Sequence, residues 1–486
     1  MRILIASSEV LPYSKTGGLA DMAGALAKFL ARAGHTAGVV TPLYRGTRKR
    51  WPGMRPLDMK LDVPLGDTRV TGGVWTLEPA PGLTVYFIEQ PEFFDRSDLY
   101  QENGADFEDN AERFVFFSKC AAHLARHLPW RPELLHVHDW QAALAPLFLR
   151  DQLWREVSPS APPTCLTIHN LAYQGNFDAA KFGLTNLPPA YFQSEGVEFY
   201  GRMSCLKAGL SYADQITTVS PRYAREITTE ELGSGLDGIL RRRQNVLHGI
   251  LNGVDYDEWN TEGNPHLKFP YNAGDLNGKE AGKAMLRAEF GLAETPDTPL
   301  FGTVTRLAEQ KGVDLQLAAL QEMLAGNMQF VLLGSGQREY ERGYRSLAQR
   351  YPGKCAVQIG FDTGLSHRLE AGCDFYLMPS RFEPCGLNQM YSLRYGTIPI
   401  VRATGGLDDS VTDIAEDADA ADGIKFSEYS VRALAKAIRK AQALYADKPL
   451  MRHYQHNAMT RDFSWDRTVS EYIALYEEII GKTKKD

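Results

Sequence analysis

The stretch from Arg381 to Leu407, RFEPCGLNQMYSLRYGTIPIVRATGGL, constrains the fold more than any other part of the chain. An apolar run at Asp374–Ser380 precedes it and is typical of a buried parallel strand. A second apolar run, Thr397–Val401, lies inside the stretch, and each run ends in a glycine-containing turn that opens a helical pattern. Strand, turn and helix repeated in this way predict an open α/β sheet that holds a ligand at the carboxyl ends of its strands.

The first of these turns has the chemistry of a binding site. Backbone N–H groups around Gly386–Asn388, together with the positive end of the helix dipole, favour an anion. Glu383 stands beside them, and its carboxylate can accept two hydroxyl hydrogen bonds from one ligand. The turn therefore predicts a ligand that carries both negative charge and hydroxyl groups.

Length and composition bound the class of protein. A chain of 486 residues is too long for one ordinary core, so we expect two domains. With a net charge of −7, the chain lacks the excess of positive charge that is typical of proteins that bind nucleic acid. The six cysteines form no CxxC pairs, so we interpret them as reduced core residues. The N-terminal apolar run is too short for a signal peptide or a membrane span. We therefore expect a cytoplasmic protein that binds neither nucleic acid nor membrane.

The first half of the chain begins as a doubly wound domain. A strand at Arg2–Glu9 leads into a loop that contains Lys15, Gly17 and Gly18, and apolar residues then recur at helical spacing over Leu19–Leu30. The loop lacks the GxGxxG dinucleotide fingerprint. Lys15 suits a phosphate or a polar sugar, and a plain turn with a surface lysine is an equally good interpretation.

Two other features of this half require interpretation. The residues from 48 to 94 alternate between short segments with Pro and Gly, which indicates hairpins inserted on the rim. The tetrapeptide TGGL occurs at Thr16–Leu19 and again at Thr404–Leu407. We expect two glycine turns, one in each domain, that bring backbone amides close to a polar ligand.

Three histidines follow strand-like runs. His136 and His138 point to one face of a strand, as metal ligands must, and His169 would be the obvious third ligand. No carboxylate or cysteine set completes a recognisable metal motif, so polar strand ends with a helix cap at Asp139 are the favoured alternative. His169 ends a buried strand, which places it in the ligand cleft by the logic of the fold.

The second half restarts the α/β alternation after a turn at Asn252–Gly253, where we place the domain boundary. Arg306 ends a strand and Lys311 opens the next helix, so the two cations can form a phosphate clamp; a pair of surface charges is the alternative. Gly334 and Gly336 resemble a Rossmann turn without its third glycine, which argues against NAD. The C-terminal segment predicts an amphipathic helix, with these residues on one side: Trp465, Tyr472, Leu475 and Ile479.

These groups together indicate a class of reaction. Cations without a carboxylate-rich metal site imply an anionic leaving group that side chains neutralise, and a glutamate with a histidine suits the hydroxyls of a sugar. Transfer from a nucleotide sugar fits this set. A hydrolase with paired carboxylates is the rival, but Glu383 has no evident sequence partner for such a pair.

The motifs resemble a known family in its own order along the chain. KTGGLADM, HDWQAALAP, TIHNLAYQG, ILNGVDYDEW, TRLAEQKG, PSRFEPCGLNQMYSLRYGTIPIVRATGGL and FSW closely resemble the bacterial glycogen synthases and the plant starch synthases. The resemblance implies the GT-B fold, with two Rossmann-like domains that face a deep cleft. The implied ranges are 1–250 for the N-terminal domain, 251–460 for the donor domain, and 461–486 for a helix that crosses back to the first domain.

The resemblance also implies the reaction. Glucose would pass from ADP-glucose to the non-reducing end of an α-1,4-glucan, with retention of configuration and with no metal or cofactor. The implied catalytic residues are Glu383, His169, Arg306 and Lys311. The implied substrate-binding residues are Lys15, Gly18, Asp21, Asn252, Arg306, Lys311, Phe361, Cys385, Gly386, Leu387, Asn388, Tyr391, Thr404 and Gly405.

The chain departs from the wider glycosyltransferase pattern at one position and varies at another. Tyr391 stands where related families have a second glutamate, and the resemblance implies that its ring stacks on or near the nucleotide. Asn388 stands where many relatives have threonine, a polar exchange that keeps the start of the helix.

Two alternative interpretations of the function remain: a transferase that uses UDP-glucose, and an inactive glucan-binding relative. In the favoured mechanism Glu383 positions and stabilises the sugar and is not a nucleophile, and closure of the domains about 252–260 excludes water.

Overall fold

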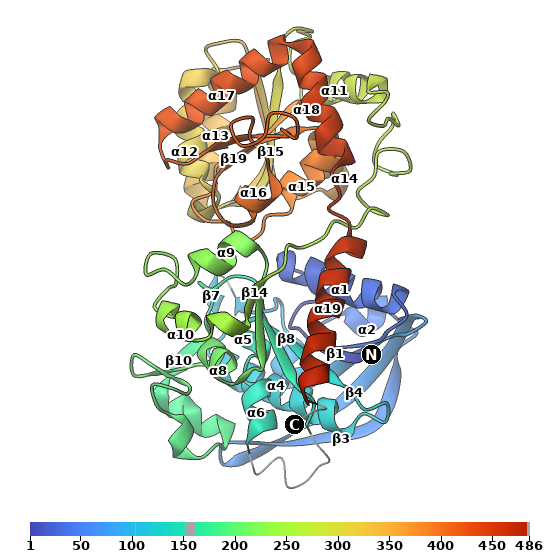
Figure 1. Cartoon of the computed structure of the whole chain (residues 1–486), viewed down its shortest axis with the longest axis vertical. Helices are drawn as coiled ribbons and strands as arrows, with labels where there is room; N and C mark the ends of the chain where they lie inside the picture. Colours follow the sequence, from blue (N-terminus) through green and yellow to red (C-terminus); the bar gives the residue numbers. More distant parts are fainter. Residues whose placement is uncertain (103, 152–160, 484–486) are drawn as a thin grey trace. The chain divides into compact units, whose positions relative to one another are not determined.

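The structure is a computed structural model that describes residues 1–102, 104–151 and 161–483. The chain divides into two compact units, which Figure 1 colours along the sequence. Unit 1 comprises residues 1–219, 224–250 and 465–486, and unit 2 comprises residues 220–223 and 251–464. The last three residues of unit 1 lie outside the described part of the chain. No helix in the described part is long and apolar enough to cross a membrane.

Unit 1 is built on a mainly parallel sheet. In the described residues the strand order is β14-β13-β9-β8-β1-β2-β5-β4-β3, and only the β3–β4 and β4–β5 pairs are antiparallel. The strands of this sheet are β1 (Arg2–Ala6), β2 (Thr36–Pro42), β3 (Arg55–Leu65), β4 (Thr68–Ala80), β5 (Leu83–Glu89), β8 (Leu134–His138), β9 (Thr164–Ile168), β13 (Gln215–Thr218) and β14 (Leu247–Gly249). Short strands form two smaller sheets: β6 (Gln101–Glu102), β7 (Ala105–Asp106), β10 (Asn176–Asp178), β11 (Glu198–Phe199) and β12 (Arg202–Ser204).

The helices of unit 1 connect these strands. They are α1 (Gly18–Arg32), α2 (Thr47–Arg50), α3 (Pro91–Phe94), α4 (Asn110–His127), α5 (Asp139–Ala142), α6 (Ala145–Arg150), η1 (Ala179–Thr185), η2 (Pro189–Tyr191), α8 (Cys205–Tyr212), α10 (Asp237–Arg242), η3 (Gln244–Val246) and α19 (Trp465–Thr483). Helix α9 (Pro221–Glu226) has residues in both units.

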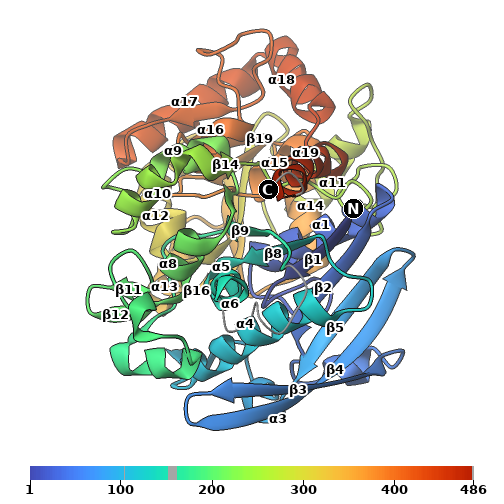
Figure 2. The same ribbon diagram turned by 60° about the horizontal axis from the view of Figure 1, so that its bottom comes forward.

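The prediction that residues 48–94 form hairpins on the rim was wrong for part of this segment. Strands β3 and β4 do form an antiparallel hairpin at one edge of the sheet, where Figure 2 shows them as two long blue strands. Strand β5, however, pairs in parallel with β2 and is an integral part of the sheet. Its sequence, LTVYFIE, is mostly buried and apolar, which is the pattern of an inner parallel strand.

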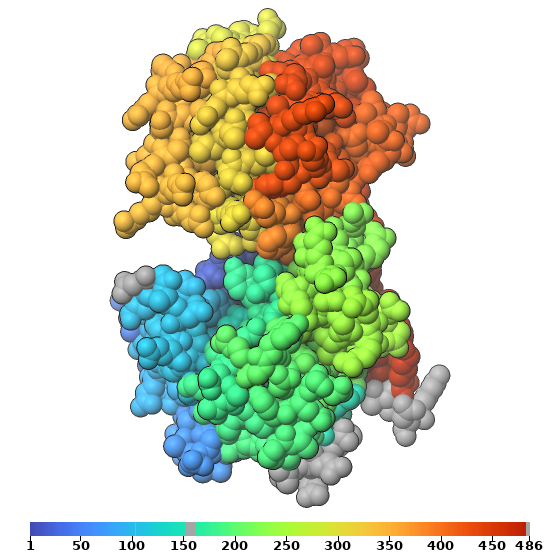
Figure 3. All heavy atoms as spheres, turned by 90° about the vertical axis from the view of Figure 1, so that its left-hand side faces the viewer, coloured from blue at the N-terminus to red at the C-terminus, as the bar shows by residue number. Residues whose placement is uncertain are grey.

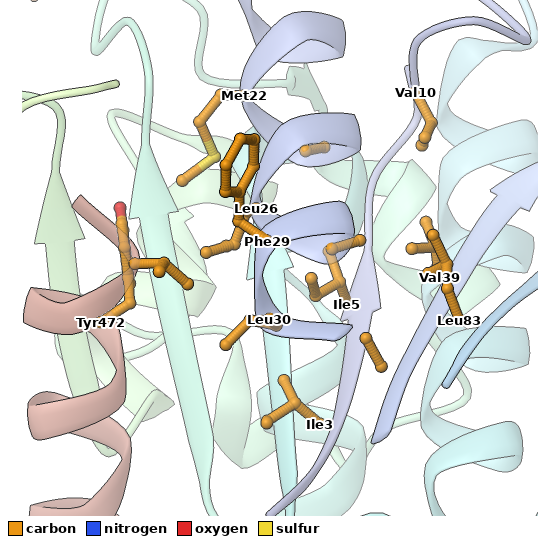
Figure 4. Close-up of a cluster of buried hydrophobic side chains, with 14 of the residues drawn as sticks. Ile3, Ile5, Val10, Met22, Leu26, Phe29, Leu30, Val39, Leu83 and Tyr472 are labelled. Atoms are coloured by element: carbon orange, nitrogen blue, oxygen red, sulfur yellow. The ribbon is translucent and has the colours of Figure 1, made fainter. Parts of the chain in front are cut away.

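The core of unit 1 explains why the C-terminal helix belongs to this unit. Figure 4 shows Met22, Leu26, Phe29 and Leu30 of α1 in one cluster with Ile3 and Ile5 of β1, and Tyr472 of α19 belongs to the same cluster. The predicted apolar face of α19 is confirmed, because Trp465, Tyr472, Leu475 and Ile479 are all buried. Helix α19, red in Figure 1, contacts the blue helix α1, and the rings of Trp465 and Phe29 stack with centroids 6.1 Å apart.

Unit 2 is built on a sheet that is parallel throughout. Residues 251–464 are all described, and their sheet has the order β17-β16-β15-β18-β19-β20. Its strands are β15 (Leu300–Leu307), β16 (Gln329–Gly336), β17 (Cys355–Ile359), β18 (Phe375–Met378), β19 (Ile398–Arg402) and β20 (Ile424–Phe426). Its helices are α11 (Asn277–Glu289), η4 (Glu309–Lys311), α12 (Val313–Met323), α13 (Arg338–Arg350), α14 (Thr363–Gly372), α15 (Asn388–Arg394), α16 (Gly405–Ser410), α17 (Val431–Ala446) and α18 (Lys448–Thr460).

The main sheet of each unit has a central pair of strands from which the chain runs outward in two directions. In unit 2 the chain runs outward from β15 to β17 in one direction and from β18 to β20 in the other. In Figure 3 the yellow and orange-red surfaces on different sides of unit 2 correspond to these two runs. In unit 1 the order reverses between β1 and β8. At such a switch point the loops after the two neighbouring strands lead to opposite faces of the sheet. Doubly wound sheets bind ligands in the crevice between these loops.

A buried ion pair fixes the two switch strands of unit 2 at their amino ends. The Asp374 carboxylate accepts the backbone N–H of Leu300 at 2.7 Å and pairs with Lys283 Nζ at 2.6 Å. Both charged side chains are 4% exposed. Loss of either partner would leave an uncompensated buried charge, so this contact locks the relative position of β15 and β18.

Candidate active site

Predicted residues of unit 2 gather at the carboxyl ends of its two switch strands. Lys311 follows β15, Glu383 follows β18, and Lys311 Nζ lies 2.7 Å from Glu383 Oε2. Ser380 Oγ donates a second hydrogen bond to the same oxygen at 3.0 Å. The Glu383 side chain is 6% exposed and the Lys311 side chain 20%. The sequence assigned the cation and the carboxylate to different parts of a ligand, and the structure adds that they pair with each other.

Arg306 differs from Lys311 in its surroundings. It lies near the end of β15 and its side chain is exposed. Within the described residues no ion pair or side-chain hydrogen bond engages its guanidinium. A paired and an unpaired cation therefore lie close together in sequence at this edge of the sheet.

The turn after β18 leaves backbone donors available. Among the described residues, no acceptor is present for the N–H groups of Gly386 and Leu387. Helix α15 begins directly afterwards at Asn388, and its seven residues make the dipole contribution to an anion site small. The individual N–H donors, rather than the dipole, are the stronger feature of this turn.

Gly405 fixes the second turn against the first. Its φ is +46°, and an added Cβ would lie 1.9 Å from the carbonyl oxygen of Glu383. Gly406 N–H donates to that same oxygen at 3.1 Å. Thr404, which precedes this pair, is 2% exposed. The backbone of the second glycine turn thus sits directly against the residue that carries the carboxylate.

The remaining predicted residues of unit 2 have distinct contacts. Asn388 Nδ2 donates to Glu370 Oε1 at 2.8 Å, and burial raises the pKa of Glu370 well above its ordinary value. The Cys385 thiol is buried, which raises its pKa to about 12, and the backbone N–H of Asn252 donates toward it. The Asn252 Oδ1 atom is buried and has no partner among the described residues.

Two aromatic residues were predicted to bind the substrate, and for Tyr391 the predicted contact is with the nucleotide. Tyr391 stacks on Trp259 with ring centroids 3.6 Å apart and an interplanar angle of 7°, so a protein ring already covers one face of Tyr391. Phe361 follows β17 and is 76% exposed. Of the two rings, Phe361 has the greater area open to a ligand.

In unit 1, the loop after β1 and the first turn of α1 hold three of the predicted residues. Lys15 Nζ pairs with Asp21 Oδ1 at 2.7 Å, and Gly18 opens helix α1. Burial raises the pKa of Asp21, while the neighbouring Lys15 lowers it. The sequence missed Glu9, which is 3% exposed and accepts hydrogen bonds from Thr16 N–H, Thr16 Oγ1 and Gly17 N–H. Glu9 shapes this loop, and its position at the end of the first strand was the only signal for it.

His169 follows β9, one strand from the switch point. Its Nε2 lies 3.0 Å from His138 Nδ1, and His138 ends β8. The rings of His136 and His138 are 4.2 Å apart, which confirms that both point to one face. His136 contacts the Tyr476 hydroxyl and Thr167 Oγ1 through its two ring nitrogens, at 2.7 and 2.6 Å.

The alternative of a metal site gains no support from the described residues. Nowhere among them do three or more His, Cys, Asp or Glu side chains gather closely enough to hold a metal ion. The ring nitrogens of His136 face hydroxyl groups, and His138 and His169 face each other. This donor set does not fit a metal ion.

The prediction that Asp139 caps a helix was wrong. The N-cap of α5 is His138, and no side chain caps that helix. Asp139 instead has φ of +54°, and its Oδ1 accepts the backbone N–H of His169 at 2.7 Å. Burial raises the pKa of Asp139 to about 7. A partly buried carboxylate on a left-handed backbone thus holds the chain at His169, which the local sequence did not reveal.

Two family models match most of the chain between them. The model described as starch synthase catalytic domain matches residues 2–242, and the model described as glycosyl transferases group 1 matches residues 287–460. Together with the two doubly wound sheets, these matches define a retaining glycosyltransferase of the GT-B class.

The more specific assignment comes from full-length relatives. Glycogen synthase from Anaeromyxobacter dehalogenans is 48% identical over 481 residues, which covers 99% of both chains. Glycogen synthase from Myxococcus xanthus is 46% identical and covers 99% of this chain and 100% of its own. The chain belongs to the glycogen synthase family, which includes the plant starch synthases.

Solved structures agree with this assignment. The catalytic domain of starch synthase IV from Arabidopsis thaliana, bound to ADP and acarbose, has a TM-score of 0.89 at 33% identity and covers 99% of each chain. Sucrose-phosphate synthase from Thermosynechococcus elongatus has a TM-score of 0.61 at 18% identity, again over 99% of each chain. The similarity to sucrose-phosphate synthase supports the fold alone.

Proposed function

We propose that this chain transfers glucose from ADP-glucose to the non-reducing end of an α-1,4-glucan, with retention of configuration. Family membership sets the class of reaction. The solved structure of the Arabidopsis starch synthase contains ADP, which is the group that ADP-glucose releases, and this supports ADP-glucose over UDP-glucose as the donor. The buried, free cysteines fit a reducing compartment, and we propose the cytoplasm as the site of the reaction.

The observation that carries the proposal is the Lys311–Glu383 pair at the switch point of unit 2. A diphosphate brings more negative charge than one lysine neutralises, and Arg306 supplies a second, unpaired cation beside it. Glu383 remains close to the cations and can accept hydroxyl hydrogen bonds from the sugar. The pair therefore suits a ligand in which a sugar and a phosphate are directly joined.

We assign the chemical step as follows. The bond between C1 of glucose and the phosphate oxygen breaks, and its electron pair stays on the phosphate, where Arg306 and Lys311 stabilise the growing charge. The acceptor hydroxyl oxygen bonds to C1 on the same face, and its proton passes to the departing phosphate. Glu383 stabilises the positive sugar without bonding to it, so the configuration at C1 is retained.

The other predicted residues have supporting tasks in this proposal. The free N–H groups of Gly386 and Leu387, in the turn Cys385–Asn388, would receive oxygens of the donor, and the tight turn at Thr404 and Gly405 would line the same end of it. Phe361, with an open ring face, suits stacking on the nucleotide base better than Tyr391, and Asn252 offers an unpartnered amide oxygen. In unit 1, we assign His169, Lys15, Gly18 and Asp21 to contacts with the transferred sugar and its phosphate.

The direct test is release of ADP from ADP-glucose in the presence of glycogen, with UDP-glucose and an acceptor-free reaction in parallel. We expect release that depends on acceptor and is accompanied by growth of the glucan. The Glu383→Gln variant should lower the rate by about 100-fold or more, because an amide cannot stabilise the positive sugar as a carboxylate does.

A matched control removes an ion pair from the same unit at a distance from the site. Arg368 pairs with Glu289 between α14 and α11, and the Arg368→Gln variant should keep nearly full activity. Preference for UDP-glucose would overturn the donor assignment, and absence of transfer from either donor by folded protein would overturn the enzymatic proposal.

A further inference from the structure

Three histidines at the carboxyl ends of β8 and β9 form one buried cluster. His136 and His138 are fully buried, and His169 is partly exposed. Burial lowers the pKa of His136 and of His169 to about 3, and the pKa of His138 lies well below its ordinary value for the same reason. No carboxylate accepts from any of the three rings in the described part of the chain. All three rings are therefore neutral near pH 7, and each carries one N–H.

The contact between His138 and His169 allows only two arrangements of these protons. His138 Nδ1 and His169 Nε2 are 3.0 Å apart, so one nitrogen donates and the other accepts. In the first arrangement His138 donates from Nδ1, and the proton of His169 must then be on Nδ1. In the second arrangement His169 donates from Nε2, and the proton of His138 must then be on its own Nε2.

The surroundings of His138 distinguish these arrangements. Its Nε2 is buried and has no hydrogen-bonding partner among the described residues. The second arrangement would leave a buried N–H without an acceptor, whereas the first leaves only an unused lone pair. Orphaned buried N–H groups are rarer in proteins than under-satisfied acceptors, so the first arrangement is favoured.

His169 is held in a way that leaves its other nitrogen open. Its backbone N–H donates to Asp139, so the carboxylate fixes the main chain and not the ring. His169 Nδ1 has no partner in the described part of the chain and is not among the buried unsatisfied atoms. This nitrogen is therefore the one that can meet a ligand.

We propose that His138 is a positioning residue that fixes His169 as the Nδ1–H tautomer, so that His169 presents a hydrogen-bond donor to an oxygen of the substrate. The proposal rests on the function proposed above for His169, but it can be tested without a substrate. Sugar hydroxyl and phosphate oxygens are the ligand atoms that accept from such a donor. A pyridine-like nitrogen at the same place would repel phosphate oxygens.

The first experiment measures the tautomer itself. We would label the full chain with 15N-histidine and record long-range 1H–15N correlations near pH 7.5, assigning the signals from single-histidine variants. We expect His169 to show a protonated Nδ1 and an unprotonated Nε2, and His138 to show a protonated Nδ1. A protonated Nε2 on His169 would overturn the inference whatever the activity of the enzyme.

The second experiment links the tautomer to catalysis. The His138→Asn variant keeps an N–H donor near the position of Nδ1, whereas His138→Leu removes the donor. We expect His138→Leu to lower kcat/KM for glucan transfer by about 10-fold to 100-fold and to mix the tautomers of His169, and His138→Asn to recover most of both. Equal loss in the two variants would contradict a positioning role.

A control separates this effect from general loss of a buried histidine. His248 lies on β14 of the same sheet and contacts Gln215 at 2.9 Å, so His248→Leu removes a hydrogen-bonded histidine without touching His169. We expect His248→Leu to leave the His169 signals and kcat/KM unchanged. If the tautomer is as proposed but His169→Ala retains full activity, the proposed function of His169 fails while the tautomer assignment stands.

Discussion

The two units have the same kind of sheet and a switch point at the same kind of place, yet the side chains at the two switch points differ in charge. In unit 2 the strand ends carry charged groups that face one another or remain unpaired: Lys311, Glu383 and Arg306. In unit 1 the ends of β8 and β9 carry neutral histidines, the carboxylates of Glu9 and Asp139 accept backbone N–H groups, and the Lys15–Asp21 pair beyond β1 is the charged exception. Doubly wound sheets bind ligands at such places, and under the proposed function the side chains at the strand ends decide which part of the donor each unit contacts.

The difference also separates two uses of a buried acid. Glu383 pairs with a cation and keeps its charge available to a ligand. Glu9 and Asp139 instead hold the loops at Thr16 and His169 in place. The strand ends of unit 2 thus present mainly charged side chains. Those of β8 and β9 in unit 1 present neutral N–H donors on loops that hydrogen bonds hold in place.

The largest effect should come from removing charge at the two switch points. We expect Lys311→Gln to lower kcat/KM by about 100-fold to 1000-fold, because a charge-stabilising donor is lost at the leaving group. Lys15→Gln should cost clearly less, since Lys15 is 44% exposed and pairs with Asp21. Steady-state rates of ADP release measure both variants, and equal losses would break the contrast between the units.

The second test uses the repeated tetrapeptide TGGL. Gly405→Ala would push a methyl group against the Glu383 carbonyl at a positive φ, so we expect destabilisation of up to about 3 kcal/mol and a matching loss of activity. Gly17 occupies the equivalent position in unit 1, with an extended backbone and open space around its Cβ position. Gly17→Ala should therefore be nearly neutral. The free energy of unfolding in urea and the rate of ADP release are measured for both variants. If Gly405→Ala kept the stability and activity of the unmodified chain, the two turns would be equivalent.

The third and smallest effect is acid sensitivity of unit 1. The folded-state pKa of His136 and His169 is about 3, below the unfolded value of 6.5, so the folded state binds fewer protons. Their stabilisation is full above pH 6.5 and falls as the pH drops toward 3. For buried His136 the loss at pH 5 is about 2 kcal/mol. Unit 2 also contains a buried histidine, His367, whose pKa burial lowers to about 4.

Hydrogen exchange read by mass spectrometry can resolve the two units. Between pH 7.5 and pH 5 the titratable groups of unit 1 act in opposite directions: protonation of the histidines destabilises β8 and β9, whereas protonation of Asp139, whose pKa burial raises to about 7, stabilises the same strand ends. The histidine contribution is isolated by comparing the unmodified chain with the His136→Gln variant, because glutamine keeps hydrogen bonding and does not titrate. After correction for intrinsic exchange rates, β8 and β9 should lose more protection on acidification in the unmodified chain than in the variant, and equal losses in the two proteins would contradict a histidine origin.

The sequence predicted the elements that carry strong local patterns. The apolar runs before Glu383 and before His169 identified the strands β18 and β9, and the helical spacing over Leu19–Leu30 identified α1. Placement of functional residues at strand ends followed from the fold class alone. The buried face of α19 was also readable, since its apolar residues recur at helical spacing.

What the sequence could not supply depends on contacts between distant segments. The hydrogen bond from His169 N–H to Asp139 joins residues that follow two different strands, and the local pattern of an Asp before a helix suggests a cap. The stacking of Tyr391 on Trp259 likewise joins segments far apart in the chain. Strand β5 was misjudged because alternating segments with Pro and Gly on both sides outweighed its short apolar run.

The path of the chain through the two units has a consequence for synthesis on the ribosome. Residues 251–464 complete unit 2 in one continuous piece, apart from residues 220–223. Unit 1 needs α19, whose Trp465, Tyr472 and Tyr476 belong to the same core as α1. The β1–α1 segment therefore leaves the ribosome before unit 2 but gains its full core only after unit 2 has been made, because helix α19 follows residues 251–464 in the chain. Until then the part of α1 that packs on α19 stays uncovered, and a chain truncated before residue 465 would expose it permanently.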